Sequence, residues 1–539
     1  MSSFVQRTSA ALNPRATSQH EPIPGRETEM VVNSSGGVTF TINNFDYLDR
    51  FLIIGSEGGN YYSSEAKVTK SAIELVKKCL VEDYVKTIDR IVEVSVKGLG
   101  IKNNAAIIAL SIAASSDHRS TRKYALDKMA DVARISTDLF KFVEMTRAQR
   151  GNGRLFKEAV QGWYLDKDPS SMGYQLVKYK SRDGWSHRDL LRLYRPKPSN
   201  PEQQANFRYA VKGEIHSEAS KVICGAGYLQ GFYNKVSKDS LPGLINKTIE
   251  MYGLSWEMIP SELLAEPSTW DALIKNKTLP FNAMVRNLGR MTANGCLATM
   301  STSAITVCEI LKDKETIKKS RIHPIALLMA LKIYQSGKGG KGSLCWVPNY
   351  SIVNALEGAF QLSFDNVIPT GKRTLYALDV SGSMSSMVPG SDYISAREFS
   401  AALSMVLSKV EPIHHIMGFA HSFINLGIHP GMSLSEVTRK ISGIPFGATD
   451  CSLPITWAMA NKVPVDNFVV ITDNETNYGK IHPSQALAVY RKQTGINSKL
   501  AVLATSVSSF SIADPQDVGM IDMVGVSPDV PTVLNKFFA

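Results

Sequence analysis

The sequence has no run of 18 consecutive apolar residues, so it predicts no membrane-spanning helix. Its first 19 residues contain no acidic side chain and no apolar segment of the kind that directs secretion. We therefore expect a disordered N-terminal arm over residues 1–30 and a cytoplasmic protein, although scattered Arg, Ser and Thr leave a transit peptide open. The 6 cysteines include no Cys-x-x-Cys pair, which predicts reduced thiols rather than a disulfide framework or a zinc site.

Positive charge is distributed unevenly along the chain. The net charge is +11, but from Arg373 onward there are 11 Lys and Arg against 13 Asp and Glu. The first 372 residues therefore hold 49 Lys and Arg against 36 Asp and Glu. Such an asymmetry indicates that nucleic acid or another anionic surface is the partner of the first part.

The 539 residues are too many for one ordinary hydrophobic core. Two different patterns of apolar residues divide the chain into two parts. From about residue 64 to 335, apolar side chains recur at helical spacing and alternation typical of strands is almost absent. This pattern predicts an all-α domain of HEAT-like helix pairs over residues 31–372. From 373 to 539, strand-length and helix-length segments alternate, which predicts an α/β doubly wound sheet.

Oxygen-bearing side chains follow two predicted strands of the second part. Thr374–Val380 contains Asp379-x-Ser381-x-Ser383 at its end, and Asn467–Thr472 is followed directly by Asp473. Thr449 lies on a Gly-containing loop between them. One carboxylate and two hydroxyls at alternate positions suit Mg²⁺, which accepts few protein oxygens and keeps several waters. The alternative is that Asp379 and the serines only cap the next helix.

These residues, in this order, resemble the metal-ion-dependent adhesion site of von Willebrand factor A domains. The resemblance implies that a divalent metal, expected to be Mg²⁺, is held by Asp379, Ser381, Ser383, Thr449 and Asp473. A protein partner would then offer a carboxylate to the metal, so a metal-dependent adhesion or scaffold module is one functional hypothesis. Hydrolysis at this site is rejected because the motif lacks a second cluster of carboxylates, and we expect no enzymatic activity.

A basic, aromatic stretch at 176–198 is the candidate RNA site of the helical part. Ser186-x-x-Asp189 predicts a capping box at a helix start, where free N–H groups attract phosphate. Tyr179, Trp185 and Tyr194 lie between the basic residues, as base-stacking side chains would. The alternative is a solvated basic face with Trp185 in the core. The predicted RNA-contacting residues are Lys178, Lys180, Arg182, His187, Arg188, Arg192 and Arg195.

Several long motifs occur between about residue 31 and the C-terminus, including Gly184-Trp-Ser-His-Arg-Asp-Leu-Leu-Arg-Leu193, Arg286-Asn-Leu-Gly-Arg-Met-Thr-Ala-Asn294 and Pro445-Phe-Gly-Ala-Thr-Asp-Cys-Ser-Leu-Pro454. These motifs resemble the Ro autoantigen (TROVE) family. The resemblance implies a monomeric ring of HEAT-like helices closed by a von Willebrand factor A domain.

The same resemblance implies a function in RNA quality control. Members bind small noncoding Y RNAs on the outer basic surface and take single-stranded 3′ ends of misfolded noncoding RNAs into the ring. Lys178 and Arg182 match basic positions that the family uses for RNA, and Arg195 stands where the family has a histidine. Bacterial members hand RNA to an exoribonuclease, polynucleotide phosphorylase, which is therefore an expected partner.

Overall fold

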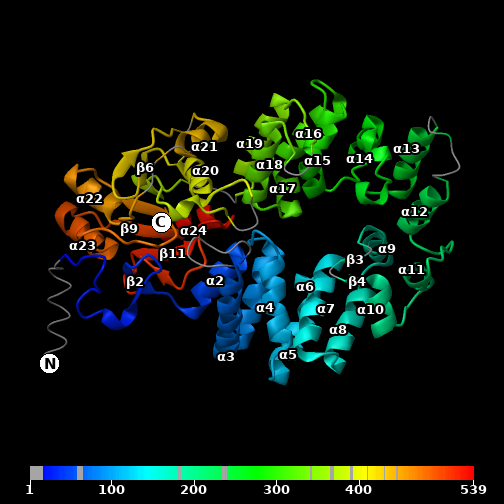
Figure 1. The fold of residues 1–539 in the computed structure, drawn as a ribbon, viewed down its shortest axis with the longest axis horizontal. Helices are drawn as coiled ribbons and strands as arrows, with labels where there is room; N and C mark the ends of the chain where they lie inside the picture. Colours follow the sequence, from blue (N-terminus) through cyan, green and yellow to red (C-terminus); the bar gives the residue numbers. More distant parts are fainter. Residues whose placement is uncertain are drawn as a thin grey trace.

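Helices of the first part stack side by side around a ring, and a C-terminal α/β domain closes the ring (Figure 1). The structure, a computed structural model, describes residues 16–56, 65–179, 181–182, 184–232, 237, 240–339, 343–364, 369–388, 392–408, 411–429, 431–442, 444 and 447–539. The predicted fold class, a helical-repeat ring joined to a doubly wound sheet, is confirmed. Among the described residues, no helix combines the length and the apolar character needed to cross a bilayer.

The ring consists of helices with short connections. Its first half contains α2 (Asn44–Ile54), α3 (Glu65–Lys97), α4 (Asn104–Ala114), α5 (Arg119–Asp127), α6 (Met129–Val132), α7 (Ser136–Arg150), α8 (Arg154–Leu165), α9 (Pro169–Lys178) and α10 (His187–Tyr194). A two-stranded ribbon, β3 (Ser181–Arg182) and β4 (Trp185–Ser186), separates α9 from α10. The second half contains α11 (Pro201–Lys212), α12 (Lys221–Phe232), α13 (Leu241–Tyr252), α14 (Pro267–Lys275), α15 (Phe281–Ala293), α16 (Thr302–Lys312), α17 (Lys314–Ser320), α18 (Pro324–Ser336) and α19 (Tyr350–Leu362).

The C-terminal domain is built on a six-stranded sheet with the order β11-β9-β8-β5-β6-β7. Its strands pair in parallel except for the edge strand β7, which runs antiparallel to β6. The elements are β5 (Thr374–Asp379), α20 (Ala396–Ser408), β6 (His414–Phe419), β7 (Phe423–Asn425), α21 (Leu434–Ser442), α22 (Leu453–Ala460), β8 (Asn467–Thr472), α23 (Pro483–Thr494), β9 (Lys499–Ala504), β10 (Phe510–Ser511), β11 (Met520–Val524) and α24 (Val530–Phe538).

Both faces of this sheet are buried, as the continuous apolar runs of its strands require. Along β5, Tyr376 and Leu378 face the core that the domain shares with the ring, together with α20, α21 and α24. Leu375 and Ala377 face the opposite way, into a second core with α22 and α23. The parallel strands therefore direct their carboxyl ends to one edge of the sheet, where the polar residues that follow β5 and β8 can meet.

The N-terminal segment differs from the prediction of a disordered arm over residues 1–30. Residues 1–15 lie outside the described part, but residues 16–30 pack on the C-terminal domain. The backbone N–H of Thr17 donates to the Gln485 side chain at 3.1 Å, and the Arg26 guanidinium pairs with Asp514 at 2.6 Å. β1 (Met30–Val32) and β2 (Val38–Thr41) then form a small sheet with β10. Its stabilising partners lie more than 400 residues away in sequence, so local composition does not reveal them.

The two ends of the ring meet each other as well as the C-terminal domain. Gly98, after α3, lies so close to the α17–α18 turn that an added Cβ would be 2.9 Å from the Cβ of Arg321. His323 is buried beside it, and burial lowers the pKa of its imidazole to about 3. The nearby backbone of Val526 and Leu99 acts in the opposite direction and raises this pKa. We call these five residues, from three parts of the chain, the closure seam.

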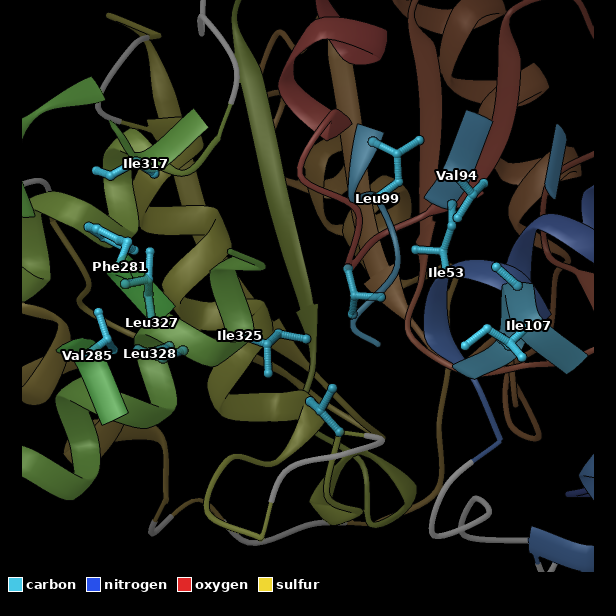
Figure 2. Packing of buried hydrophobic residues seen from close by; sticks show 14 of the residues in the cluster. Ile53, Val94, Leu99, Ile107, Phe281, Val285, Ile317, Ile325, Leu327 and Leu328 are labelled. Atoms are coloured by element: carbon cyan, nitrogen blue, oxygen red, sulfur yellow. The ribbon is translucent and has the colours of Figure 1, made fainter. Parts of the chain in front are cut away.

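Apolar packing is continuous on both sides of the closure seam. Figure 2 shows Ile53 of α2, Val94 of α3 and Leu99, which follows α3, on one side and Leu327 and Leu328 of α18 on the other. All of them belong to one buried cluster that also includes one face of the C-terminal sheet. The ring and the domain therefore share a hydrophobic core.

Within the described part of the chain, two ion pairs join the ring to the C-terminal domain. Arg50 of α2 is 1% exposed and pairs with Asp522 of β11 at 2.5 Å. Its guanidinium also donates to the backbone carbonyls of Ser508 and Phe510, each at 2.8 Å. Lys332 of α18 pairs with Glu398 of α20 at 2.7 Å on the other side of the ring.

We expect Arg50→Ala to lower the free energy of unfolding by about 3 to 5 kcal/mol, because it leaves Asp522 and two carbonyls buried without their partner. The matched control is Lys123→Ala, which breaks an exposed pair with Asp127 on α5 and should cost about 0.3 to 0.5 kcal/mol. Urea denaturation measures both. A loss below about 1 kcal/mol for Arg50→Ala would contradict the role given to this pair.

Candidate metal centre and nucleic-acid interface

The predicted metal-binding residues lie on neighbouring loops at the carboxyl edge of the sheet. Asp379 is the last residue of β5, Ser381 follows in the turn after the strand, and Ser383 begins a short 3₁₀ helix. Asp473 comes directly after β8, the strand beside β5. Thr449 is buried on a third loop, whose backbone bonds join it to the segment after Asp473.

Hydrogen bonds bring four of these side chains together. The Asp379 carboxylate accepts from the Ser381 N–H at 2.9 Å and from the Thr472 hydroxyl at 2.6 Å. The Ser381 and Ser383 hydroxyls lie 3.1 Å apart, and Ser383 in turn hydrogen-bonds Asp473. Two carboxylates and two hydroxyls therefore converge on one buried point.

The two carboxylates are buried, and neither forms a salt bridge with a residue in the described part of the chain. Burial and then the charge of Asp473 raise the pKa of Asp379 to about 7, and burial also raises the pKa of Asp473. The nearby guanidinium of Arg397 donates to the backbone carbonyls of Ser381 at 2.9 Å and Ile444 at 3.1 Å, and its charge also interacts with Asp379. Additional positive charge at this point would favour the ionised form of both carboxyls.

A divalent cation fits this arrangement. The described residues contain no group of three or more His, Cys, Asp and Glu side chains that could hold a metal, so hydroxyls must complete the ligand set. Hard cations accept hydroxyl and carboxylate oxygens together, and Mg²⁺ keeps several of its waters. Asp379, Ser381, Ser383, Thr449 and Asp473 are the residues that would hold it, and the bound ion would supply a positive centre for an anionic group of a partner.

Four arginines of the basic stretch are exposed and form the candidate nucleic-acid interface. Arg188 and Arg192 are one turn apart on α10, Arg195 caps its C-terminus, and Arg182 lies on the ribbon before it. Among the described residues, none of the four takes part in an ion pair. We call Arg182, Arg188, Arg192 and Arg195 the arginine face. Among the described residues, these guanidinium groups can bind phosphates without first breaking an ion pair, and the Arg195 Nε donates only to the backbone carbonyl of Arg192, at 3.3 Å.

The structure contradicts the prediction that His187 contacts RNA. The capping box of Ser186 and Asp189 is present, but His187 points inward, where its ring receives a hydrogen bond or donates one to the Tyr164 hydroxyl at 2.8 Å. Burial lowers the pKa of His187 to about 3, so it is neutral in the core. Tyr194, expected to stack on a base, is also buried, and its hydroxyl donates to Asn152 at 2.8 Å.

Lys178, another predicted RNA contact, is largely buried. It ends α9, whereas Arg182 lies in β3. The Lys178 side chain is 9% exposed, pairs with Glu257 at 3.4 Å and lies over the rings of Tyr174 and Tyr179. Lys180 lies outside the described residues.

Arg147 on α7 joins this surface although the basic stretch does not contain it. Its guanidinium lies 4.7 Å from the ring centroid of Trp185, which is itself half-buried against the core. Trp185 therefore agrees with both interpretations of the sequence. Part of its side chain packs against the core, and its ring also contacts the Arg147 guanidinium beside the arginine face. The sequence signal for Arg147 is the basic last turn of α7. The local sequence does not indicate that this turn lies beside β4.

Comparison with known proteins gives matches over nearly the whole chain. Residues 31–223 and 223–332 match the TROVE domain, and residues 373–538 match the Ro60 vWA domain. A Deinococcus radiodurans protein named RNA-binding protein RO60 is 34% identical, over 98% of each chain. A Caenorhabditis elegans protein of the same name is 33% identical, over 94% of this chain and 90% of its own.

A solved structure is also similar to this fold. The crystal structure of the Deinococcus radiodurans Ro (Rsr) protein superposes with a TM-score of 0.67 at 32% sequence identity. The match covers 92% of this chain and 99% of that one. The relatives are named as RNA-binding proteins, not as enzymes.

The buried carboxylate pair predicts a pH response of the metal-free protein. The pKa of Asp379 is about 7 when folded and about 4 when unfolded, so the folded state binds the extra proton between these values. Stability therefore increases as the pH falls from 8 to 5. In EDTA, we expect Asp379→Asn to melt above the wild type at pH 8, with a difference that shrinks toward pH 5.

Asp466→Asn is the matched control. Hydrogen bonding by Arg373 holds the pKa of Asp466 below its usual value, so removing this carboxylate should lower the melting temperature at pH 8. Thermal melts of the three proteins at both pH values check the prediction. A lower melting temperature for Asp379→Asn at pH 8 would show that the pair is not repulsive.

Proposed function

The chain belongs to the Ro60 family, and from that premise we propose that it is an RNA-binding protein that binds small structured RNAs, of the Y RNA type, and the single-stranded 3′ ends of misfolded noncoding RNAs. Its role is RNA quality control within a ribonucleoprotein, without catalysis of its own. The observation that supports this proposal most directly is the arginine face.

Charge and geometry both support RNA as the ligand. The ring contains the whole positive excess of the chain, and the arginine face is exposed on it. Arginine suits phosphate because its planar fork can donate two parallel hydrogen bonds. Trp185, with Arg147 beside it, adds a partly exposed aromatic surface of the kind on which unpaired bases stack.

The test is binding to a structured small RNA with a single-stranded 3′ tail, with tailless RNA and duplex DNA as competitors. We expect tight, tail-dependent binding that weakens steeply with salt. Replacing all four residues of the arginine face by Glu should weaken binding and reduce the slope of log K against log salt by about 3, since each lost phosphate contact accounts for about 0.7 to 0.9.

The matched control replaces four exposed lysines on α16 and α17 by Glu, namely Lys312, Lys314, Lys318 and Lys319. The change of net charge is the same, but the lysines lie on the other half of the ring (Figure 1). Equal losses in both variants would mean that total charge, not the arginine face, binds RNA. Equal binding to all three nucleic acids would contradict the proposed function.

The metal site supports a second role, in which a bound Mg²⁺ accepts a carboxylate of a protein partner. An exoribonuclease such as polynucleotide phosphorylase, which would receive the RNA, is the candidate partner. The supporting observation is the buried pair of Asp379 and Asp473 beside two hydroxyls.

Calorimetric titration with Mg²⁺ or Mn²⁺ tests this role. We expect one cation to bind the wild type, and Ser383→Ala to bind it about 10-fold or more weakly because a ligand oxygen is lost while both carboxylates remain. RNA binding by the arginine face should be unchanged in that variant. Cation binding that survives in Asp379→Asn and Asp473→Asn would place the ion elsewhere.

A further inference from the structure

We propose that residues 17–37, which we call the N-terminal strap, hold the loops of the metal site in position, and that Gln19 and Asn33 are the positioning residues. The inference rests on the metal site proposed above. Gln19 lies outside the segments that match the two family domains, which begin at residues 31 and 373.

Gln19 joins the loop of Thr449 to the loop of Asp473. Its side chain is fully buried, and its amide nitrogen donates to the Asp450 carboxylate at 2.8 Å and to the Ile481 carbonyl at 2.7 Å. Its amide oxygen accepts from the Thr476 hydroxyl, which lies three residues after Asp473. One side chain thereby satisfies groups on both loops.

Asn33 and Ser35 hold the Asp473 loop from the other side. The Asn33 amide donates to the Thr476 carbonyl at 2.6 Å, and its oxygen accepts from the Gly37 N–H at 2.9 Å. The Ser35 N–H and hydroxyl donate to the carboxylate and the backbone carbonyl of Glu475, at 3.1 and 3.0 Å. The Glu475 N–H in turn donates to the Asp473 carboxylate at 3.1 Å. A chain of hydrogen bonds therefore runs from the strap to a predicted metal ligand.

Two glycines show how closely the strap packs on the loops. A Cβ at Gly37 would lie 1.8 Å from the Thr476 carbonyl oxygen, so no other residue fits there without moving the backbone. Gly479 has a φ of +121°, and a Cβ there would lie 2.6 Å from the Gln19 amide nitrogen. Close approach on both sides leaves the two loops little freedom while the strap is in place.

This packing bears on cation affinity because the ligands come from separate loops. Binding must fix those loops relative to each other, and loops that are already ordered lose less conformational entropy on binding. Residues that orient metal ligands typically change affinity by about 10- to 100-fold when they are replaced. The same effect is expected for Gln19 and Asn33.

The experiment measures Mn²⁺ binding by calorimetry in the full chain with Gln19→Met, Asn33→Leu and a matched control. Both replacements keep approximate side-chain size and remove the hydrogen bonds. The control is Arg26→Gln, which loosens the same segment from Asp514 without touching either loop. We expect dissociation constants about 10 to 100 times higher for the first two variants and near the wild-type value for Arg26→Gln.

Melting temperatures with and without Mn²⁺ separate positioning from general stability. A merely structural role would lower both temperatures equally, whereas weaker cation binding reduces the increase that Mn²⁺ produces. Wild-type affinity in Gln19→Met and Asn33→Leu, or equal losses in all three variants, would overturn the strap proposal alone. No binding by the wild type would contradict the metal site itself and the strap proposal with it.

Discussion

Closure of the ring is the constraint on which the rest of the structure depends. A stack of helix pairs leaves an apolar surface at each end, which must be covered to be stable in water. Here the two ends cover each other at the closure seam, and the C-terminal domain covers both. The buried pair of Arg50 and Asp522 adds specificity rather than hydrophobic energy, because its charges are satisfied in only one docking geometry. Because one apolar cluster spans the ring and the domain, closure of the ring is part of folding.

A consequence of this closure is that the metal site is fixed relative to the ring. Two neighbouring residues of α20 contact different parts of the structure. Arg397 donates to the Ser381 carbonyl in the metal site, and Glu398 pairs with Lys332 of α18 in the ring. A rigid helix therefore connects the loop of the metal site with the last part of the ring. The N-terminal strap restrains the other two loops from the outside. The site is built by three parts of the chain, although its predicted ligands all come from one domain.

Prediction from the sequence succeeded where a residue pattern acts locally. The predicted strand Asn467–Thr472 matches β8 residue for residue, because a continuous apolar run is a local property. The capping box at Ser186 was recognised for the same reason. The sequence did not reveal that His187 and Lys178 are largely buried, because tertiary packing decides where these side chains lie. His187 packs against other helices and contacts Tyr164, and Lys178 is 9% exposed and pairs with Glu257.

The two candidate sites respond to different physical variables. The arginine face is exposed, so its attraction for phosphate is screened within about 8 Å at physiological ionic strength. The carboxylates of the metal site are buried, where bulk salt screens little and the local dielectric strengthens every interaction. Ionic strength therefore acts on the first site, and cation concentration and pH act on the second. The strap and α20 hold the loops of the metal site, and none of these contacts involves α10. A cation at the metal site would therefore leave the charge of the arginine face unchanged. Such independence would allow the proposed RNA ligand and the proposed protein partner to bind one chain at the same time.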